Sequence, residues 1–195
     1  MIRDTSKAIK DMTEEEREEL IKRRKKRCLK YLKVYIQEKD NSAARLRGFI
    51  DGWYGFHKKG EYLNKNLNGR WLNNPDCTKP EIKACLEGMD FISVGARAVL
   101  DGLSQELLIK EHAVPVKVIR DLLLELPSNS SLAKIEGVLL THYKLGALTK
   151  DEDNQINKIK VNSKNNSKSL RSDMPDNWDK KDMFARYVAA GIKEA

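Results

Sequence analysis

The sequence predicts a mainly α protein: an irregular helical bundle of about six to seven helices, with a long loop rich in glycine and aromatic residues and a C-terminal helix on a flexible linker. Apolar residues recur at helical spacing in several separate stretches, and no run alternates strongly between apolar and polar residues. With 195 residues, of which 40% are apolar, the chain is long enough to bury one substantial core.

The first expected helix is long and basic and covers residues 13–39. Thr13 and Glu16 have the spacing of a capping box, in which each side chain bonds the backbone N–H of the other residue. Apolar residues from Ile21 to Ile36 recur at helical spacing, so one face of this helix is expected to be buried. Turn-forming residues at 40–42 precede a second expected helix at 43–53.

Residues 54–80 are expected to form the long irregular loop, because they contain three glycines, two prolines and many asparagines. Further helices are expected from Pro80 to about Val99 and at about 103–112, 115–126 and 131–145. Residues 1–161 are therefore predicted to form a single mainly helical domain.

The end of the chain has a different composition. Residues 162–175 are mostly polar and of low complexity, which predicts a flexible linker. Residues 176–195 are expected to form an amphipathic helix that binds a protein partner through one face. That face holds Met183, Phe184, Tyr187 and Val188.

Positive charge is concentrated in the first part of the chain. The formal net charge is +8, and residues 1–75 carry nineteen basic against eleven acidic side chains. Cations neutralise phosphate whatever the base sequence, so a dense basic run predicts contact with a nucleic-acid backbone. The run has no acid and eight basic residues: Lys22, Arg23, Arg24, Lys25, Lys26, Arg27, Lys30 and Lys33.

Eight of the thirteen aromatic residues lie between Tyr31 and Trp71. Flat rings stack on unpaired bases, which favours single strands or RNA as the partner. An alternative role for Phe49, Trp53 and Trp71 is ordinary core packing. The residues expected to extend the basic patch are Arg45, Arg47, Lys58, Lys59 and Arg70, and those expected to stack on bases are Tyr54 and Tyr62.

Two other interpretations of the basic run stay open. It is also the composition of a solvated helix face balanced by the glutamates that precede it. Lys22–Arg27 also fits a short nuclear localisation signal.

The segment from Leu103 to Leu122 resembles the helix-turn-helix of bacterial and phage repressors over about twenty residues. Ser104 stands at the cap position and Ala113 at the turn position that glycine usually holds. Ile109 departs from the pattern, which prefers a small alanine there. The resemblance implies that a helix from Pro115 onward would read DNA. Ordinary packed helices often show the same pattern, so both interpretations are kept.

No catalytic motif is present. The chain lacks a phosphate-binding glycine-rich loop, a GxSxG motif and an HExxH motif, so no catalytic residue, cofactor or enzymatic activity is assigned. The three cysteines form no CxxC pair and the three histidines are widely spaced, which argues against a zinc site and against a disulfide framework. We expect no transmembrane segment and a cytoplasmic location, or a nuclear one in a eukaryotic or viral setting.

These patterns predict a non-enzymatic nucleic-acid-binding accessory or regulatory protein, a class that includes viral and phage factors. Its partner would be RNA or DNA, held by the basic N-terminal helix. The alternative is a protein-interaction module, such as an oligomeric adaptor, an inhibitor or a matrix-like assembly subunit. In that case the C-terminal helix would bind a protein partner or a second copy of the chain.

Overall fold

The computed structural model describes residues 12–39, 43–54, 56–58, 61–62, 83, 86–161 and 168–195. Four helices form one half of the molecule: α1 (Glu14–Glu38), α2 (Ala43–Tyr54), α5 (Val116–Leu124) and α6 (Leu132–His142). Two short strands, β1 (Phe56–Lys58) and β2 (Glu61–Tyr62), pair antiparallel after α2.

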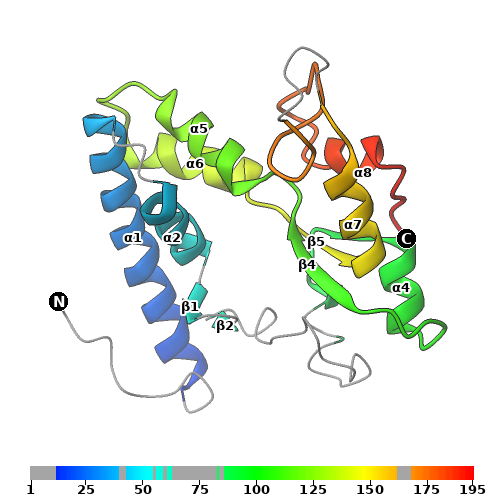
Figure 1. The fold of residues 1–195 in the computed structure, drawn as a ribbon. Helices are drawn as coiled ribbons and strands as arrows, with labels where there is room; N and C mark the ends of the chain where they lie inside the picture. Colours follow the sequence, from blue (N-terminus) through cyan, green and yellow to red (C-terminus); the bar gives the residue numbers. More distant parts are fainter. Residues whose placement is uncertain are drawn as a thin grey trace.

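The other half is built on a three-stranded sheet. Its order is β3 (Phe91–Ile92), β5 (Leu145–Thr149) and β4 (Leu108–His112), with β5 in the centre. Strands β3 and β5 are parallel, and β4 is antiparallel to β5. The same half contains α4 (Val94–Leu100), α7 (Lys150–Lys158) and α8 (Ala185–Ala189). The two halves lie side by side, with α1 at one end and α4 and the C-terminus at the other (Figure 1).

Local signals explain the position of α1. Thr13 Oγ1 accepts a hydrogen bond from the backbone N–H of Glu16, and Glu16 Oε2 accepts one from the N–H of Thr13, so the predicted capping box is confirmed. The helix ends at Lys39, which has a left-handed backbone conformation (φ 55°). The buried face of α1 consists of Leu20, Cys28, Leu29, Leu32 and Ile36.

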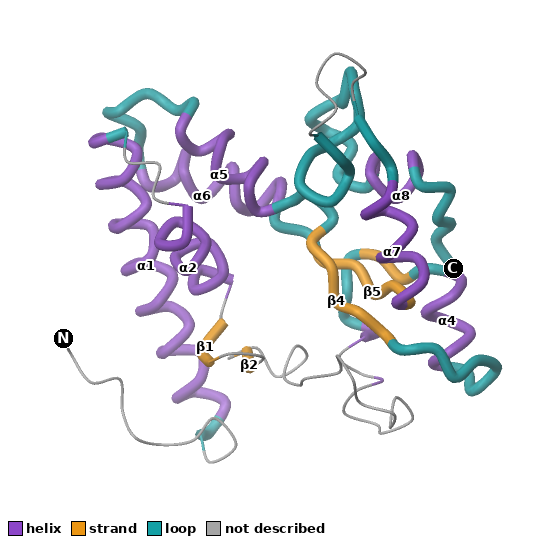
Figure 2. The backbone as a smooth tube through the Cα atoms, viewed as in Figure 1, coloured by secondary structure: helices purple, strands orange, loops and turns teal. Residues whose placement is uncertain are grey.

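Every residue of β5 is buried, and its two faces belong to different cores. Leu145 and Ala147 face the larger core, which also contains the buried residues of α1, α2, α5 and α6. Leu148 faces a smaller core with Phe91 and Tyr187. Since successive side chains of a strand point to opposite faces, this one segment joins both cores. Figure 2 shows β5 beside β4 in the sheet-containing half.

The C-terminal segment, including α8, closes the smaller core. Tyr187 is fully buried and contacts Phe91, with ring centroids 4.8 Å apart. Leu170 is also fully buried, and its N–H donates to the carbonyl of Ile159. The last residue is fixed to the sheet half, because Ala195 N donates to the carbonyl of Ile92 at 2.9 Å.

Several sequence-based expectations need correction. The chain is broadly mainly α, but it also contains a small mixed sheet, which was not expected. Residues 108–112 form β4 instead of a helix, so the helix-turn-helix over Leu103–Leu122 is wrong. The helix expected at 131–145 ends at His142, because residues 145–149 pair with two strands.

The region from Pro80 to Val99 was also expected to be one helix. Of its described residues, 91–92 form β3 and 94–100 form α4, with Ser93 capping α4 through its side chain. In the predicted linker, residues 162–167 lie outside the described residues. Residues 168–175 contain the buried Leu170 and Met174 and are therefore packed, not free. The C-terminal helix is shorter than expected and covers Ala185–Ala189.

Within the described residues, no helix combines the length and the apolar character that crossing a membrane requires.

We predict that Gly146→Ala destabilises the protein. A Cβ at this position would lie 2.7 Å from Tyr187 Oη and 2.9 Å from the ring carbon Cε2. Overpacking of this kind lowers the free energy of unfolding by about 1–3 kcal/mol, which urea denaturation measures. Gly137→Ala is the matched control, because a Cβ there meets no atom within 4 Å. The free energy of unfolding of the control variant is expected to rise by about 0.5–1 kcal/mol, because alanine is more favourable than glycine inside a helix. Equal effects of the two variants would contradict the packing argument.

Candidate nucleic-acid interface

The basic run lies on α1, and its side chains are exposed to different degrees. Lys22, Arg23, Lys26, Arg27 and Lys30 are exposed, whereas the side chains of 24, 25 and 33 are half-buried. Four lysines follow one another at spacings of four, four and three residues, which places them in one row along the helix. At a rise of 1.5 Å per residue the row is about 17 Å long. The row consists of Lys22, Lys26, Lys30 and Lys33.

No described carboxylate neutralises the lysine row through an ion pair. In the described part of the chain, none of its four members has an ion-pair partner. Beside the row, Arg23 Nε lies 3.8 Å from Glu19 Oε1, an exposed pair one helical turn apart. Exposed pairs of this kind contribute little to stability because water screens them. The row therefore keeps its positive charge available to a ligand.

Lys25 has a structural role that the sequence did not indicate. Its Nζ lies 5.3 Å from the centroid of the Trp53 ring, which is a cation–π geometry. Trp53 itself is 3% exposed, and its Nε1 donates to Glu136 Oε1 at 3.1 Å. Trp53 therefore belongs to the core, as its alternative interpretation supposed.

Tyr54 is half-buried and is not free to stack on a base with both faces. Its ring is stacked on Tyr143, with centroids 4.3 Å apart and an interplanar angle of 27°. Of the described aromatic residues, Tyr31 is the exposed one, at 47%. It is stacked on Phe49, with centroids 4.7 Å apart and an angle of 18°. Sequence reasoning did not select Tyr31, although its position one turn after Arg27 in the basic run could have identified it.

A groove of about 520 Å³ runs beside the basic run. Its apolar wall comes from Ile21 and Leu29 of α1 and Leu132 of α6. The groove is also lined by lysines at positions 22, 25 and 26 and by glutamates at positions 18 and 136. This surface thus combines apolar area with charges of both signs.

The other residues predicted to contact nucleic acid do not form one surface with the lysine row in the described part of the chain. Arg45 is exposed on α2, and Arg47 is exposed but lines a separate pocket with His112. Residues 58 and 62 lie in β1 and β2, whose side chains are not described. Lys59 and Arg70 lie outside the described residues.

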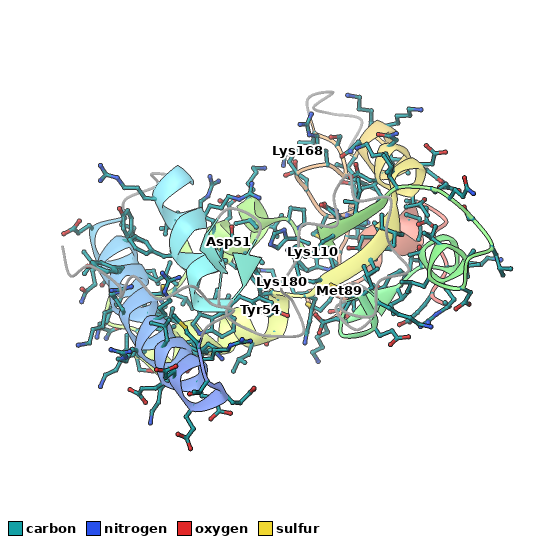
Figure 3. All side chains as sticks on the ribbon, turned by 90° about the horizontal axis from the view of Figure 1, so that it is seen from below. Asp51, Tyr54, Met89, Lys110, Lys168 and Lys180 are labelled. Carbon is teal, nitrogen blue, oxygen red and sulfur yellow. The ribbon has the colours of Figure 1, made fainter. Side chains whose placement is uncertain are left out.

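The basic residues near the predicted linker do not join the α1 face. Lys168 lies in the sheet-containing half, at the opposite side of the molecule from α1 (Figure 3). Positive charge is therefore present on two separated surfaces, and the lysine row belongs to only one of them.

The predicted partner-binding residues are placed mostly inside the molecule. Met183 and Tyr187 are 8% and 0% exposed and pack in the chain's own cores. Phe184 is half-buried against Phe91, with ring centroids 5.2 Å apart. Of the four residues, Val188 is the exposed one, at 68%.

A polar cluster joins the two halves behind Arg47. Asp51 lies on the side of α2 that faces the sheet (Figure 3). Its Oδ1 accepts a hydrogen bond from Tyr143 Oη at 2.9 Å and lies 3.4 Å from His112 Nε2. Burial alone would raise the pKa of Asp51, but the His112 ring, the Tyr143 hydroxyl and Arg47 together hold the pKa below its ordinary value.

No protein-family model, no curated protein and no solved structure matches this chain. Among the described side chains, no group of three or more His, Cys, Asp or Glu residues is arranged to hold a metal ion. Within the described residues, the site consists of a row of lysines without ion-pair partners and one exposed aromatic ring, Tyr31, beside it.

We predict that Asp51→Asn destabilises the junction between the two halves at pH 7. The variant keeps the shape of the side chain but removes the charge that His112 and Arg47 face, so the free energy of unfolding should fall by about 1–3 kcal/mol. Because the pKa of Asp51 is lowered in the fold, the charge of Asp51 contributes fully to stability above pH 3.8, its ordinary pKa. This contribution is lost as the pH falls through the folded-state pKa.

Urea denaturation at pH 7 and pH 3 measures this difference. The stability gap between wild type and Asp51→Asn should be smaller at pH 3. The exposed Asp101→Asn is the control and should leave stability unchanged at pH 7. A gap that is constant with pH would show that Asp51 acts by shape and not by charge.

Proposed function

We propose that this protein binds nucleic acid without catalysing a reaction, through the exposed face of α1. The observation that carries the proposal is the lysine row, in which Lys22, Lys26, Lys30 and Lys33 lie along one face with no ion-pair partner in the described part of the chain. A row of cations about 17 Å long can span several phosphates of a nucleic-acid backbone, which carries a negative charge about every 3.4 Å on each strand of a duplex.

The electrostatic repulsion within the lysine row favours a role in ligand binding over a role in solubility alone. Like charges four residues apart on a helix repel each other and destabilise it by a few tenths of a kcal/mol per pair. Two such pairs occur here, Lys22 with Lys26 and Lys26 with Lys30. A solvated face that served solubility alone would alternate the signs, as Glu19 and Arg23 do one turn earlier. A polyanion on this face relieves the repulsion.

The exposed ring favours single strands or RNA as the partner. Tyr31 is held by its stack on Phe49, so its orientation is fixed before any ligand arrives. A base that stacks on the outer part of this ring gains contact area at little cost in side-chain entropy. In a duplex the bases are already stacked on each other and do not reach such a ring.

The alternative function, a protein-interaction module, has less support. It relies on the apolar face of the C-terminal segment, and two of its four residues, Met183 and Tyr187, are buried in the chain's own cores. Val188 alone presents a large exposed apolar side chain among those four.

We predict that replacing all four lysines of the row by glutamine abolishes most binding. Fluorescence anisotropy with a labelled single strand at several salt concentrations measures the affinity. Each phosphate contact contributes about 0.7–0.9 to the slope of log K against log salt, so the variant should lose up to about three units of slope. The control variant carries Lys158, Lys160, Lys168 and Lys193→Gln, which are exposed in the other half.

The control has the same net charge as the test variant, so it separates a specific face from total charge. The proposal requires full binding by the control and weak binding by the α1 variant. If both variants bind equally, the α1 face is not the interface.

We predict that Tyr31→Leu weakens binding to single strands by roughly tenfold to a hundredfold, because stacking of one base contributes about 1–3 kcal/mol. Tyr31→Phe keeps a ring and should bind like the wild type. Parallel titrations with a duplex of the same length should show no difference among the three proteins. A loss that is equal for duplex and single strand would rule out stacking.

A further inference from the structure

A second site lies where the two halves meet. A pocket of about 420 Å³ is lined by side chains from α2, β4, the start of α5, α7 and the loop at 171–172. This volume lies in the range of small-molecule sites, which is about 300–1,000 Å³. Four cationic side chains from four separate segments line the pocket: Arg47, Lys117, Lys150 and Arg171.

The two acids of the pocket wall are already paired with donors. Glu111 Oε1 accepts a hydrogen bond from Arg186 Nη2 at 2.6 Å. Asp153 accepts from Lys150 Nζ at 2.7 Å and from Asn157 Nδ2 at 3.2 Å. These carboxylates therefore orient the wall and do not leave it with excess negative charge.

Arg186 lies behind Glu111 and offsets its negative charge. The residue is 0% exposed, and Glu111 is its ion-pair partner. Its Nε and Nη1 atoms are buried and have no hydrogen-bond partner among the described residues. Since Arg186 and Glu111 carry opposite charges and are in contact, Arg186 reduces the repulsion between Glu111 and an anion in the pocket.

Two of the four cations already have a carboxylate partner: Lys117 Nζ lies 2.6 Å from Asp173 Oδ1, and Lys150 Nζ lies 2.7 Å from Asp153 Oδ2. The two arginines provide the remaining donors. Arg47 approaches Asp51 through Nε at 3.5 Å, which leaves the terminal nitrogens of its guanidinium for other acceptors. Arg171 is exposed and has no ion-pair partner in the described part of the chain. Pro115 is the cap residue of α5 and makes no side-chain cap hydrogen bond, and Pro115, Val116 and Lys117 line the pocket, so the N-terminal end of this helix lies at the pocket.

We propose that this pocket binds the phosphate monoester of a nucleotide-sized compound. A monoester has three terminal oxygens and a charge close to −2, so it can accept hydrogen bonds from several converging donors at once. Lysine supplies a point charge and arginine a planar fork for phosphate oxygens, and both are present. A backbone phosphodiester is a poorer match, because it has two free oxygens and a single charge.

The pocket does not depend on the function proposed for α1. None of its lining residues belongs to the lysine row, so either proposal can fail while the other stands. The phosphate has two chemical sources: a free nucleotide, or the terminal phosphate of a nucleic-acid strand.

Isothermal titration calorimetry of the full chain with adenosine 5′-monophosphate and with adenosine tests the proposal. The monophosphate should bind at least tenfold more tightly than the nucleoside, because charge-assisted hydrogen bonds to the phosphate are lost in the latter. Arg171→Gln should lower the affinity for the monophosphate by about tenfold, and the double variant Lys117→Gln, Arg171→Gln should lower this affinity further. The α1 variant with four glutamines is the control and should bind the monophosphate like the wild type.

Arg171→Gln breaks no ion pair in the described part of the chain, so its result does not depend on the stability of the fold. Equal affinity for monophosphate and nucleoside, or unchanged affinity in Arg171→Gln, would overturn the proposal. A strand with and without a 5′-phosphate separates the two sources. Tighter binding of the phosphorylated strand, lost in Arg171→Gln, identifies the strand end. Binding of free monophosphate with no effect of strand phosphorylation identifies the nucleotide.

Discussion

The burial of β5 on both faces and along both edges is the constraint on which the rest of the structure depends. Strands β3 and β4 occupy its edges, the helical core covers Leu145 and Ala147, and the C-terminal segment covers Leu148. Gly146 permits the close approach of Tyr187, since a Cβ would meet that ring below 3.0 Å. By pairing with β4, strand β5 also fixes the position of Glu111 and His112, which line the pocket.

Local signals predicted the helices, and long-range pairing decided the strands. The capping box and apolar stripe of α1 lie within the helix itself, so the sequence alone identifies them. A strand buried on both faces shows no alternation of apolar and polar residues, and β5 therefore looked like the end of α6. Met183 and Tyr187 were predicted to face a protein partner, whereas the fold buries both in the chain's own cores.

The candidate interface divides in the same way. Eight charges on α1 must be solvated or paired, so their position near the surface follows from the sequence. Aromatic rings have no such restriction: Trp53 and Tyr54 pack in or against the core, and Tyr31 is exposed. The pocket could not be predicted, because its lining comes from five segments that are distant in the sequence.

The order of charges along α1 has a kinetic consequence. The acids at Glu14–Glu16 lie at the positive end of the helix dipole and offset it, whereas the cations begin about two turns later. A polyanion that approaches the helix is repelled near the first turn and attracted beyond it, so it experiences a torque before contact. Steering of this kind raises the association rate at low ionic strength and fades when the Debye length becomes shorter than the helix. The order of acids and cations along α1 would thus orient an elongated polyanion before it makes contact.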